Sequence, residues 1–247
     1  MHDRPREHDG TCHIWWAFVG GAARSRRHLL SRAERERAGA LRQTADQDRF
    51  VAGRALLRTL AADLLGTTAD RVVVGASCPD CPRPHGKPTL PGTAWEASIS
   101  HSGQLVAVAL STAGPVGVDL ERIDETMPLL ELRSQVLSET ESAECPDHTP
   151  RAFFRTWTRK EAVLKATGDG LRIPMTRMTV TAAAAVPGVM WFPDRAELLD
   201  RVRLADLEAP PGYSASVAVI STGAVGYADH GIVAPGRPRE LSGAGAR

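Results

Sequence analysis

Two long helices whose ends are both marked in the sequence constrain the fold of this chain more than any other feature. The first is predicted from about Asp46 to Leu65, where Gly66 stops it. The second begins at the capping residue Thr149, followed by Pro150, which suits a first helical position, and it ends before Gly168. Strand-like runs lie between and after these helices. The pattern therefore predicts a chain of mixed α and β structure.

Shorter elements are predicted from the same kinds of signal. A capping box at Ser31–Glu34 predicts a helix through about Gln43. A helix from about Leu129 to Leu137 precedes a second capping-box sequence at Ser138–Glu141. Short apolar runs predict five strands. They are Ile14–Val19, Val72–Val74, Ala97–Ser100, Leu105–Leu110 and Val116–Ile123, with a turn at His101–Gly103.

One strand–turn–strand sequence occurs twice. Residues 106–119 contain Val-Ala-Val-Ala-Leu-Ser-Thr, a glycine turn and Val-Gly-Val-Asp. Residues 216–229 contain Ser-Val-Ala-Val-Ile-Ser-Thr and then Val-Gly-Tyr-Ala-Asp. Short strands of this composition are common, so the similarity alone is a weak signal. It is nevertheless what a duplicated α+β unit leaves behind.

The composition is that of a soluble globular protein. Hydrophobic residues make up 43% and charged residues 24%, and no apolar run approaches the roughly 20 residues that span a bilayer. The chain opens on a polar segment rather than on a charged and apolar leader, so we expect a cytoplasmic protein. A net charge of +1 gives no overall attraction to nucleic acid or to a membrane.

Lysine is rare in this chain. Of 30 cationic residues, only Lys87, Lys160 and Lys165 are lysine, and the others are arginine. In a chain that otherwise uses arginine, a lysine indicates a position that needs a compact ammonium on a flexible stem.

The cysteines include a C-x-x-C at Cys78 and Cys81, with His85 four residues later. Half of a zinc site and a redox pair are its two chemical interpretations. A structural zinc site needs four ligands, and the sequence contains no second C-x-x-C or H-x-x-H. Prolines flank the motif where a redox pair would open a helix. We therefore expect a loop without a chemical role.

Two carboxylates share one face of a predicted strand. Side chains alternate faces along a strand, so Asp119 and Glu121 point one way while Val118 and Leu120 point the other. They lie about 6–7 Å apart, and like charges so placed repel unless a cation lies between them. The alternative is a solvated strand face.

Glu161 adds a third carboxylate, one turn after Trp157 on the apolar face of the second long helix. A carboxylate there is costly unless it pairs or binds a metal ion. Its alternative partner is Lys165, four residues later in the favourable order for a surface pair. Three carboxylates on elements that can converge, with Lys160 and Lys165 beside them, indicate Mg²⁺ and a polyphosphate.

Two further features could take part in a site. The Ser98–Ser102 segment places hydroxyls and an imidazole where they can reach a phosphate, or it forms a polar turn. Arg54 lies near the apolar stripe of the first long helix, where a guanidinium needs an anionic partner or ligand. The sequence G-x-x-x-x-G-K-[S/T] is absent, which excludes a P-loop ATPase.

In their order and spacing, four motifs resemble the signature of the Sfp-type 4′-phosphopantetheinyl transferase family. They are Gly86-Lys87-Pro88, Ser98–Ser102, Gly117–Glu121 and Trp157–Lys165. The resemblance runs from Arg49 to Leu171, about half of the chain, and all three lysines fall inside it.

The resemblance implies an α+β fold of two similar α/β halves in a pseudo-two-fold arrangement, with coenzyme A in the cleft between them. Residues 1–114 would form the N-terminal half with coenzyme A-binding elements. Residues 115–225 would form the C-terminal half with the metal and catalytic elements, and residues 226–247 a disordered tail.

The resemblance also implies roles for individual residues. The Mg²⁺ ligands would be Asp119, Glu121 and Glu161, and the catalytic residues Glu161 and Lys165. Coenzyme A would be bound by Arg49, Arg54, Lys87, Ser100, His101, Asp119, Lys160 and Lys165. Glu141 matches a further acidic position of some members. The base would be Glu161, Glu141 or a metal-bound water.

The implied reaction transfers the 4′-phosphopantetheine arm of coenzyme A to a serine of an apo acyl or peptidyl carrier protein and releases 3′,5′-ADP. It would need Mg²⁺, for which Mn²⁺ can substitute, and would serve polyketide, nonribosomal peptide or fatty-acid synthesis. The protein would be a monomer, because its two halves form the cleft that shorter relatives build between subunits.

Two alternatives come from other classes of protein. A Mg²⁺-dependent phosphohydrolase would share the carboxylates but has no use for Gly86–Pro88 and Ser98–Ser102. An arginine-rich module that binds nucleic acid would need a basic face and stacking aromatic residues, whereas aromatic residues are only 5% of this chain.

Overall fold

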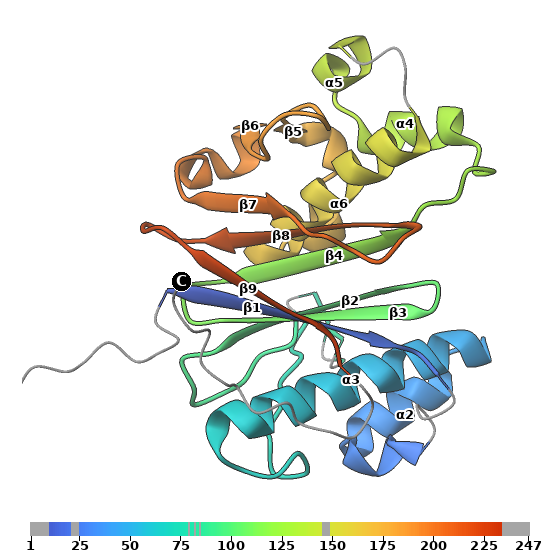
Figure 1. The fold of residues 1–247 in the computed structure, drawn as a ribbon, viewed down its shortest axis with the longest axis vertical. Helices are drawn as coiled ribbons and strands as arrows, with labels where there is room; N and C mark the ends of the chain where they lie inside the picture. Colours follow the sequence, from blue (N-terminus) through green and yellow to red (C-terminus); the bar gives the residue numbers. More distant parts are fainter. Residues whose placement is uncertain are drawn as a thin grey trace, which may run out of the picture.

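In a computed structural model of the chain, two β-sheets lie face to face, and each carries a long helix on its outer side (Figure 1). The structure describes residues 10–20, 25–78, 80–81, 83, 85–144 and 149–233. The first sheet has the strand order β2-β3-β1-β9, and the second has the order β4-β8-β7. The α+β class predicted from the sequence is confirmed.

The strands of the first sheet are β1 (Thr11–Phe18), β2 (Glu96–Ser102), β3 (Leu105–Ser111) and β9 (Gly226–Ile232). Those of the second sheet are β4 (Val116–Arg122), β7 (Val202–Asp206) and β8 (Tyr213–Ile220), and a separate pair consists of β5 (Thr179–Val180) and β6 (Val189–Trp191). The α-helices are α2 (Arg32–Ala40), α3 (Thr44–Leu65), α4 (Leu129–Val136), α5 (Glu139–Glu144) and α6 (Pro150–Thr167). Short 3-10 turns lie at Arg27–Leu29, Gly170–Arg172, Met175–Arg177 and Pro193–Leu198.

The two long helices end where the sequence marks their ends. α3 stops at Gly66, which is left-handed with a φ of 62°. α6 follows Thr149, whose side chain caps the first turn, and stops at Gly168 with a φ of 76°. Both predicted capping boxes form, at Ser31–Glu34 and Ser138–Glu141. Of the helices that the structure describes, none has the length and apolar character needed to cross a bilayer.

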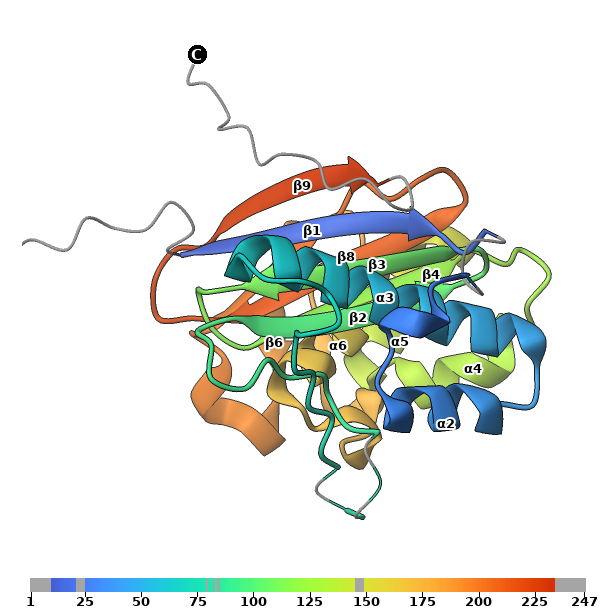
Figure 2. The ribbon, with the colours of Figure 1, turned by 90° about the horizontal axis from the view of Figure 1, so that it is seen from below.

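Side chains alternate between the two faces of each strand, and this decides which residues face the other sheet and which face the covering helix. In β4, Val116, Val118 and Leu120 pack between the two sheets. The opposite face of β4, which carries Asp119 and Glu121, therefore meets α6, which packs along this strand. β1, β3 and β8 alternate in the same way, and α3 covers the outer face of the first sheet (Figure 2).

The repeated sequence forms the same unit twice. After β3, in the first sheet, the chain crosses into the second sheet as β4. After β8, in the second sheet, it crosses back into the first as β9, which pairs in parallel with β1 (Figure 1). The two repeats thus exchange strands between the halves in opposite directions, as expected for a duplicated unit.

This exchange corrects the expected C-terminal tail. Residues 226–232 form β9 and complete the first sheet, so the prediction of disorder from residue 226 is wrong for this segment. The glycine- and alanine-rich composition does not show that a neighbouring strand supplies hydrogen bonds to these residues. Residues 234–247 lie outside the described part of the chain.

Two shorter predictions also differ from the structure. Val72–Val74 forms no strand, because a strand needs a neighbour for its hydrogen bonds, and only Gly75 bridges, to Thr89. β2 continues through His101 to Ser102, paired with β3, so the turn begins at Gly103, two residues later than predicted.

Gly117 allows α6 to approach β4 directly. A Cβ at this position would lie 2.0 Å from the carbonyl oxygen of Ala162 and 2.4 Å from the amide nitrogen of Ala166. We expect Gly117→Ala to lower the free energy of unfolding by about 1–3 kcal/mol, because the helix backbone must move away. Urea denaturation measures this loss. The matched control is Gly39→Ala in α2, where a Cβ meets nothing within 4 Å. A Gly117→Ala protein as stable as this control would contradict the close approach.

Candidate active site

A buried ion pair joins α6 to β4. Nζ of Lys165 donates to Oδ1 of Asp119 at 2.5 Å and to Oγ of Ser100 at 3.0 Å. The Ser100 hydroxyl donates to the same Asp119 oxygen at 2.9 Å. Asp119 is 2% exposed, whereas the Lys165 side chain is 28% exposed. The pair lies within the second half of the protein, its contacts with Ser100 reach the first half, and the ammonium is still accessible from outside.

Glu121 and Glu161 are the other carboxylates near this pair. Oε2 of Glu121 accepts the Ser102 hydroxyl at 2.7 Å. Glu161 lies one helical turn before Lys165, yet the ion pair of Lys165 is with Asp119. The structure therefore does not favour the simple surface pair between Glu161 and Lys165.

The crowding of carboxylates shifts their pKa values. Burial and then the charge of Asp119 raise the pKa of Glu121 to about 7. Burial also raises the pKa of Glu161, against the field of Lys165. Desolvation alone would lower the pKa of Lys165, but the ion pair with Asp119 and the fields of the other carboxylates raise it overall. Three carboxylates around one ammonium favour the binding of a further cation.

The residues present fit a Mg²⁺ ion. Oδ2 of Asp119 is buried and has no hydrogen-bond partner, so a ligand atom is available there. Carboxylate oxygens are the donors that Mg²⁺ prefers. Among the described residues, Asp119, Glu121 and Glu161 are not gathered within 4.8 Å of one another, so their side chains must close to share an ion.

Three serines on β2 connect the two sheets. Their hydroxyls accept backbone N–H groups of β4, with Ser98 bonded to Val118 at 3.0 Å, Ser100 to Leu120 at 3.3 Å and Ser102 to Arg122 at 3.0 Å. β4 lies at the edge of its sheet, and these N–H groups would otherwise lack partners. Sequence reasoning missed this connecting role, although the spacing of two between the serines is a signal for it.

A cleft of about 570 Å³ opens beside the ion pair. Lys87 and Ser98 line it from the first half of the protein, and Lys165 and Arg172 line it from the second. Nζ of Lys87 is held by the carbonyl oxygen of Ala166, at 3.0 Å. A cleft with cations on both walls suits a polyanionic ligand.

A smaller hollow of about 160 Å³ shares Gly86 with this cleft and is lined by Arg54 and His101. The predicted anionic partner of Arg54 is present, because its Nε lies 3.9 Å from Oε1 of Glu34. Nη1 of Arg54 is buried without a hydrogen-bond partner. Arg49 is tied to the turn after β2 through the carbonyl of Gly103, at 3.1 Å. Of the predicted coenzyme A-binding residues, Lys87 and Lys165 line the larger cleft, and Arg54 and His101 line the smaller hollow. Ser100 and Asp119 contact Lys165 at the edge of the larger cleft.

Lys160 does not belong to this group. It is completely buried, and its Nζ donates to Oε2 of Glu141 at 2.5 Å and to the carbonyl oxygens of Val136 and Met175 at 2.7 and 3.1 Å. All three of its N–H groups are therefore used inside the protein. The prediction that Lys160 binds coenzyme A is wrong, because its ammonium is enclosed and already donates to Glu141, Val136 and Met175.

Glu141 is equally occupied. Its Oε2 accepts the backbone N–H of Ser138 as well as Lys160, and its Oε1 accepts the N–H of Val180 at 2.8 Å. Glu141 thus anchors α5 to α6 and β5, and no free carboxylate oxygen is left for proton transfer.

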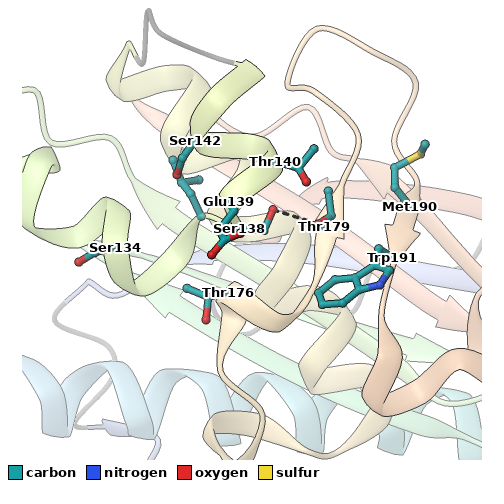
Figure 3. Close-up of a pocket in the computed structure, with 10 residues that line it drawn as sticks. Ser134, Ser138, Glu139, Thr140, Ser142, Thr176, Thr179, Met190 and Trp191 are labelled. Carbon is teal, nitrogen blue, oxygen red and sulfur yellow. Dashed lines mark hydrogen bonds between the residues drawn. The ribbon is translucent and has the colours of Figure 1, made fainter.

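A further hollow of about 910 Å³ lies between α4, α5 and the β5–β6 hairpin (Figure 3). Its walls carry hydroxyls, including Ser138, which accepts a hydrogen bond from Thr179 at 2.9 Å. Met190 and Trp191 are exposed at its edge. None of the described residues that line this hollow is an arginine or a lysine, so these walls do not suit a polyphosphate.

The sequence of residues 115–209 matches the family model of the 4′-phosphopantetheinyl transferase superfamily. The match contains Asp119, Glu121, Glu161 and Lys165. The predicted resemblance to 4′-phosphopantetheinyl transferases is confirmed at the level of the superfamily.

Several curated 4′-phosphopantetheinyl transferases are similar to this chain. A 4′-phosphopantetheinyl transferase of Bacillus subtilis is 28% identical over 156 residues, which cover 61% of this chain and 66% of that protein. HetI of Nostoc sp., also a 4′-phosphopantetheinyl transferase, is 33% identical over 150 residues, 58% of this chain and 61% of its own. AcpT of Escherichia coli O157:H7 is 36% identical over 137 residues, 52% and 64% of the two chains. The chain spans less than two thirds of the length of these relatives.

Among solved structures, the holo-[acyl-carrier-protein] synthase of Thermotoga maritima superposes with a TM-score of 0.36 at 17% identity, over 45% of this chain and 64% of that one.

Proposed function

We propose that this chain transfers the 4′-phosphopantetheine arm of coenzyme A to a serine of an apo carrier protein and releases 3′,5′-ADP. The observation that carries the proposal is the Asp119–Lys165 pair beside a cleft with cations on both walls. The match of residues 115–209 to the 4′-phosphopantetheinyl transferase superfamily supports it. In this proposal, residues 1–114 together with β9 hold coenzyme A, and residues 115–225 carry the metal and catalytic groups.

Coenzyme A would lie across the two hollows. Its phosphates are anions, and Lys87 and Lys165 face the larger cleft from opposite sides. Arg54, with an unpartnered Nη1, would bind a phosphate of the nucleotide end together with His101 and Arg49. Ser100 would act on the ligand through Lys165, which it already positions.

A Mg²⁺ ion would be held by Asp119, Glu121 and Glu161 and, when bound, would neutralise charge on the pyrophosphate of coenzyme A. The chain's own cation at this point is Lys165. The attacking serine oxygen forms a bond to the β-phosphorus, and the bond from that phosphorus to the bridging oxygen breaks. Lys165 would stabilise the negative charge that grows on the leaving phosphate.

The proton of the attacking serine must go to a base near the cleft. Within the described part of the chain, the carboxylate of Glu161 makes no hydrogen bond or ion pair, whereas both oxygens of Glu141 are engaged. We therefore assign proton acceptance to Glu161. The carrier protein belongs to polyketide, nonribosomal peptide or fatty-acid synthesis in this proposal, and the protein acts as a cytoplasmic monomer.

The experiment that tests the proposal uses the full chain with coenzyme A, Mg²⁺ and a purified apo carrier protein. Intact-protein mass spectrometry should show that the carrier gains the mass of one phosphopantetheine arm and that 3′,5′-ADP is released in equal amount. Release of 3′,5′-ADP without modification of the carrier would instead support a phosphohydrolase.

Lys165 is expected to contribute to the rate more than a surface charge does. Lys165→Ala should lower kcat by about 10²–10³-fold, since a positioned cation on the leaving group is lost. It should also lower stability by about 1–3 kcal/mol, because Asp119 is left buried without its cation. Steady-state transfer rates and urea denaturation measure the two effects.

Lys165→Arg is the matched variant. It keeps the charge and the partner of Asp119, so stability should recover, but the planar guanidinium should restore kcat only in part. A Lys165→Ala protein with kcat within about threefold of the wild-type value, under roughly 0.7 kcal/mol, would remove Lys165 from the catalytic residues.

A further inference from the structure

A second group of metal-binding side chains lies in the loop that precedes Lys87. The ligand atoms of Cys78, Cys81 and His85 all lie within 4.8 Å of one another. Sγ of Cys81 and Nε2 of His85 are 2.9 Å apart. Both cysteines are free thiols in the structure. The sequence argument against a metal site was the lack of further ligands, and the fold supplies a third one from the same loop.

The two arms of this loop are held together at their base. Gly75 and Thr89 exchange two backbone hydrogen bonds of 3.0 Å, and the N–H of Gly86 donates to the carbonyl of Ala76 at 2.8 Å. A Cβ at position 86 would lie 1.9 Å from the carbonyl oxygen of Ser77, so only glycine permits this approach. The residue before Gly86 is His85, and the residue after Ser77 is Cys78. The narrow base therefore brings the imidazole to the cysteines independently of any ion.

We propose that Cys78, Cys81 and His85 bind one Zn²⁺ ion. Two thiolates and one imidazole are a donor set that Zn²⁺ prefers. Their ligand atoms all lie within 4.8 Å of one another, which is close enough for all three to reach one ion. Two thiolates also neutralise its charge. Among the described residues no fourth His, Cys, Asp or Glu joins the group, so the fourth position belongs to a solvent molecule.

The ion would fix the arm that carries Lys87. Cys78, His85 and Lys87 all line the 570 Å³ cleft, and Lys87 follows His85 by two residues. Nζ of Lys87 bridges to α6 through the carbonyl of Ala166. Zinc thus holds the wall of the cleft that carries Lys87, in the first half of the protein, against the second half. Its effect on coenzyme A rests on the proposed function, whereas the zinc site itself does not.

The first test measures metal content. The reduced full chain is loaded with zinc, freed of unbound metal by gel filtration and analysed by mass spectrometry of the elements. About one zinc ion per chain is expected for a single Cys₂His site. Cys78→Ser, Cys81→Ser and His85→Ala should each weaken zinc binding by more than about 100-fold in competition with a chelator, because each removes a direct ligand. His28→Ala, at an exposed histidine outside the group, is the control and should bind like the wild type.

A second measurement identifies the ligands without any variant. Co²⁺ in place of zinc should give the thiolate-to-cobalt charge-transfer absorption of a site with two cysteines. A wild-type chain that binds no zinc, that isolates with Cys78 and Cys81 joined in a disulfide, or whose cobalt form lacks the thiolate band would overturn the proposal. Zinc retained at full affinity by the variants would overturn it too, since the ion would then lie elsewhere.

A final measurement separates this site from the proposed function. Removing zinc by chelation should weaken coenzyme A binding, measured by calorimetry, by about 10-fold or more if the ion positions Lys87, as expected of groups that support a site. If zinc binds at Cys78, Cys81 and His85 but coenzyme A binds to neither form, the proposed function fails and the zinc site stands. If coenzyme A binds equally well with and without zinc, the positioning of Lys87 by zinc is wrong.

Discussion

Replacing Asp119 with alanine is expected to abolish phosphopantetheine transfer, with kcat reduced by at least about 10³-fold, on the order of 4 kcal/mol. Two losses combine. The variant removes the buried Oδ2 that the structure leaves available for a metal ion, and it removes the partner of Lys165. Ser100 also loses the oxygen to which it donates. The effect should therefore exceed that of Lys165→Ala.

A readout other than transfer distinguishes metal binding from simple damage to the fold. Binding of Mn²⁺ in place of Mg²⁺, followed by electron paramagnetic resonance, should be lost in Asp119→Ala and strongly weakened in Asp119→Asn, which keeps the shape but not the charge. Glu125→Ala, at an exposed carboxylate on the loop after β4, is the matched control and should keep wild-type binding and turnover. Normal Mn²⁺ binding by Asp119→Ala would show that these carboxylates are not the metal ligands.

The second large effect concerns stability. Lys160→Ala should lower the free energy of unfolding by about 3–5 kcal/mol, because it leaves Glu141 buried without its cation. Two backbone carbonyls, of Val136 and Met175, lose a donor at the same time. Burial lowers the pKa of Lys160 while Glu141 opposes this shift, as expected for an ammonium held inside the protein by one carboxylate. Urea denaturation of the full chain measures the loss.

Two variants sharpen this result. Lys160→Met combined with Glu141→Gln removes both charges, and it should be more stable than Lys160→Ala alone, because no unpaired charge stays buried. Arg32→Ala breaks the exposed pair with Glu36, whose side chains are 89% and 65% exposed, and should change stability too little to measure. A Lys160→Ala protein of nearly wild-type stability, with a raised KM for coenzyme A, would return Lys160 to the binding site.

Local signals in the sequence account for much of the fold. Helix ends depend on capping residues and glycines within a few positions, so α3 and α6 end where Gly66 and Gly168 predict. The internal repeat indicated duplication, but not that β4 and β9 exchange between the sheets. Strand pairing joins segments far apart in the chain, and composition carries no information about the partner. That is why 226–232 was predicted to be disordered and forms β9 instead.

The candidate site shows the same division between local pattern and distant contact. The alternation of strand side chains placed Asp119 and Glu121 on one face, and helical spacing placed Glu161 and Lys165 on one side of α6. Lys160 lies five residues before Lys165. This spacing exceeds one helical turn, so the two side chains point to different sides of α6. From the sequence both looked like phosphate ligands. Their partners, Glu141 and Asp119, come from other elements and decide their roles.

The sequence by itself therefore determined the class of fold, the long helices and the carboxylate and lysine motifs, because each depends on residues within about one helical turn or one strand. Only the tertiary structure decided that Ser98, Ser100 and Ser102 join the sheets, that Lys160 is internal, and that His85 lies against Cys78 and Cys81. These outcomes depend on which backbone groups are left unpaired at an edge, and on how closely two chain segments approach. Both are properties of the packed molecule that no local pattern encodes.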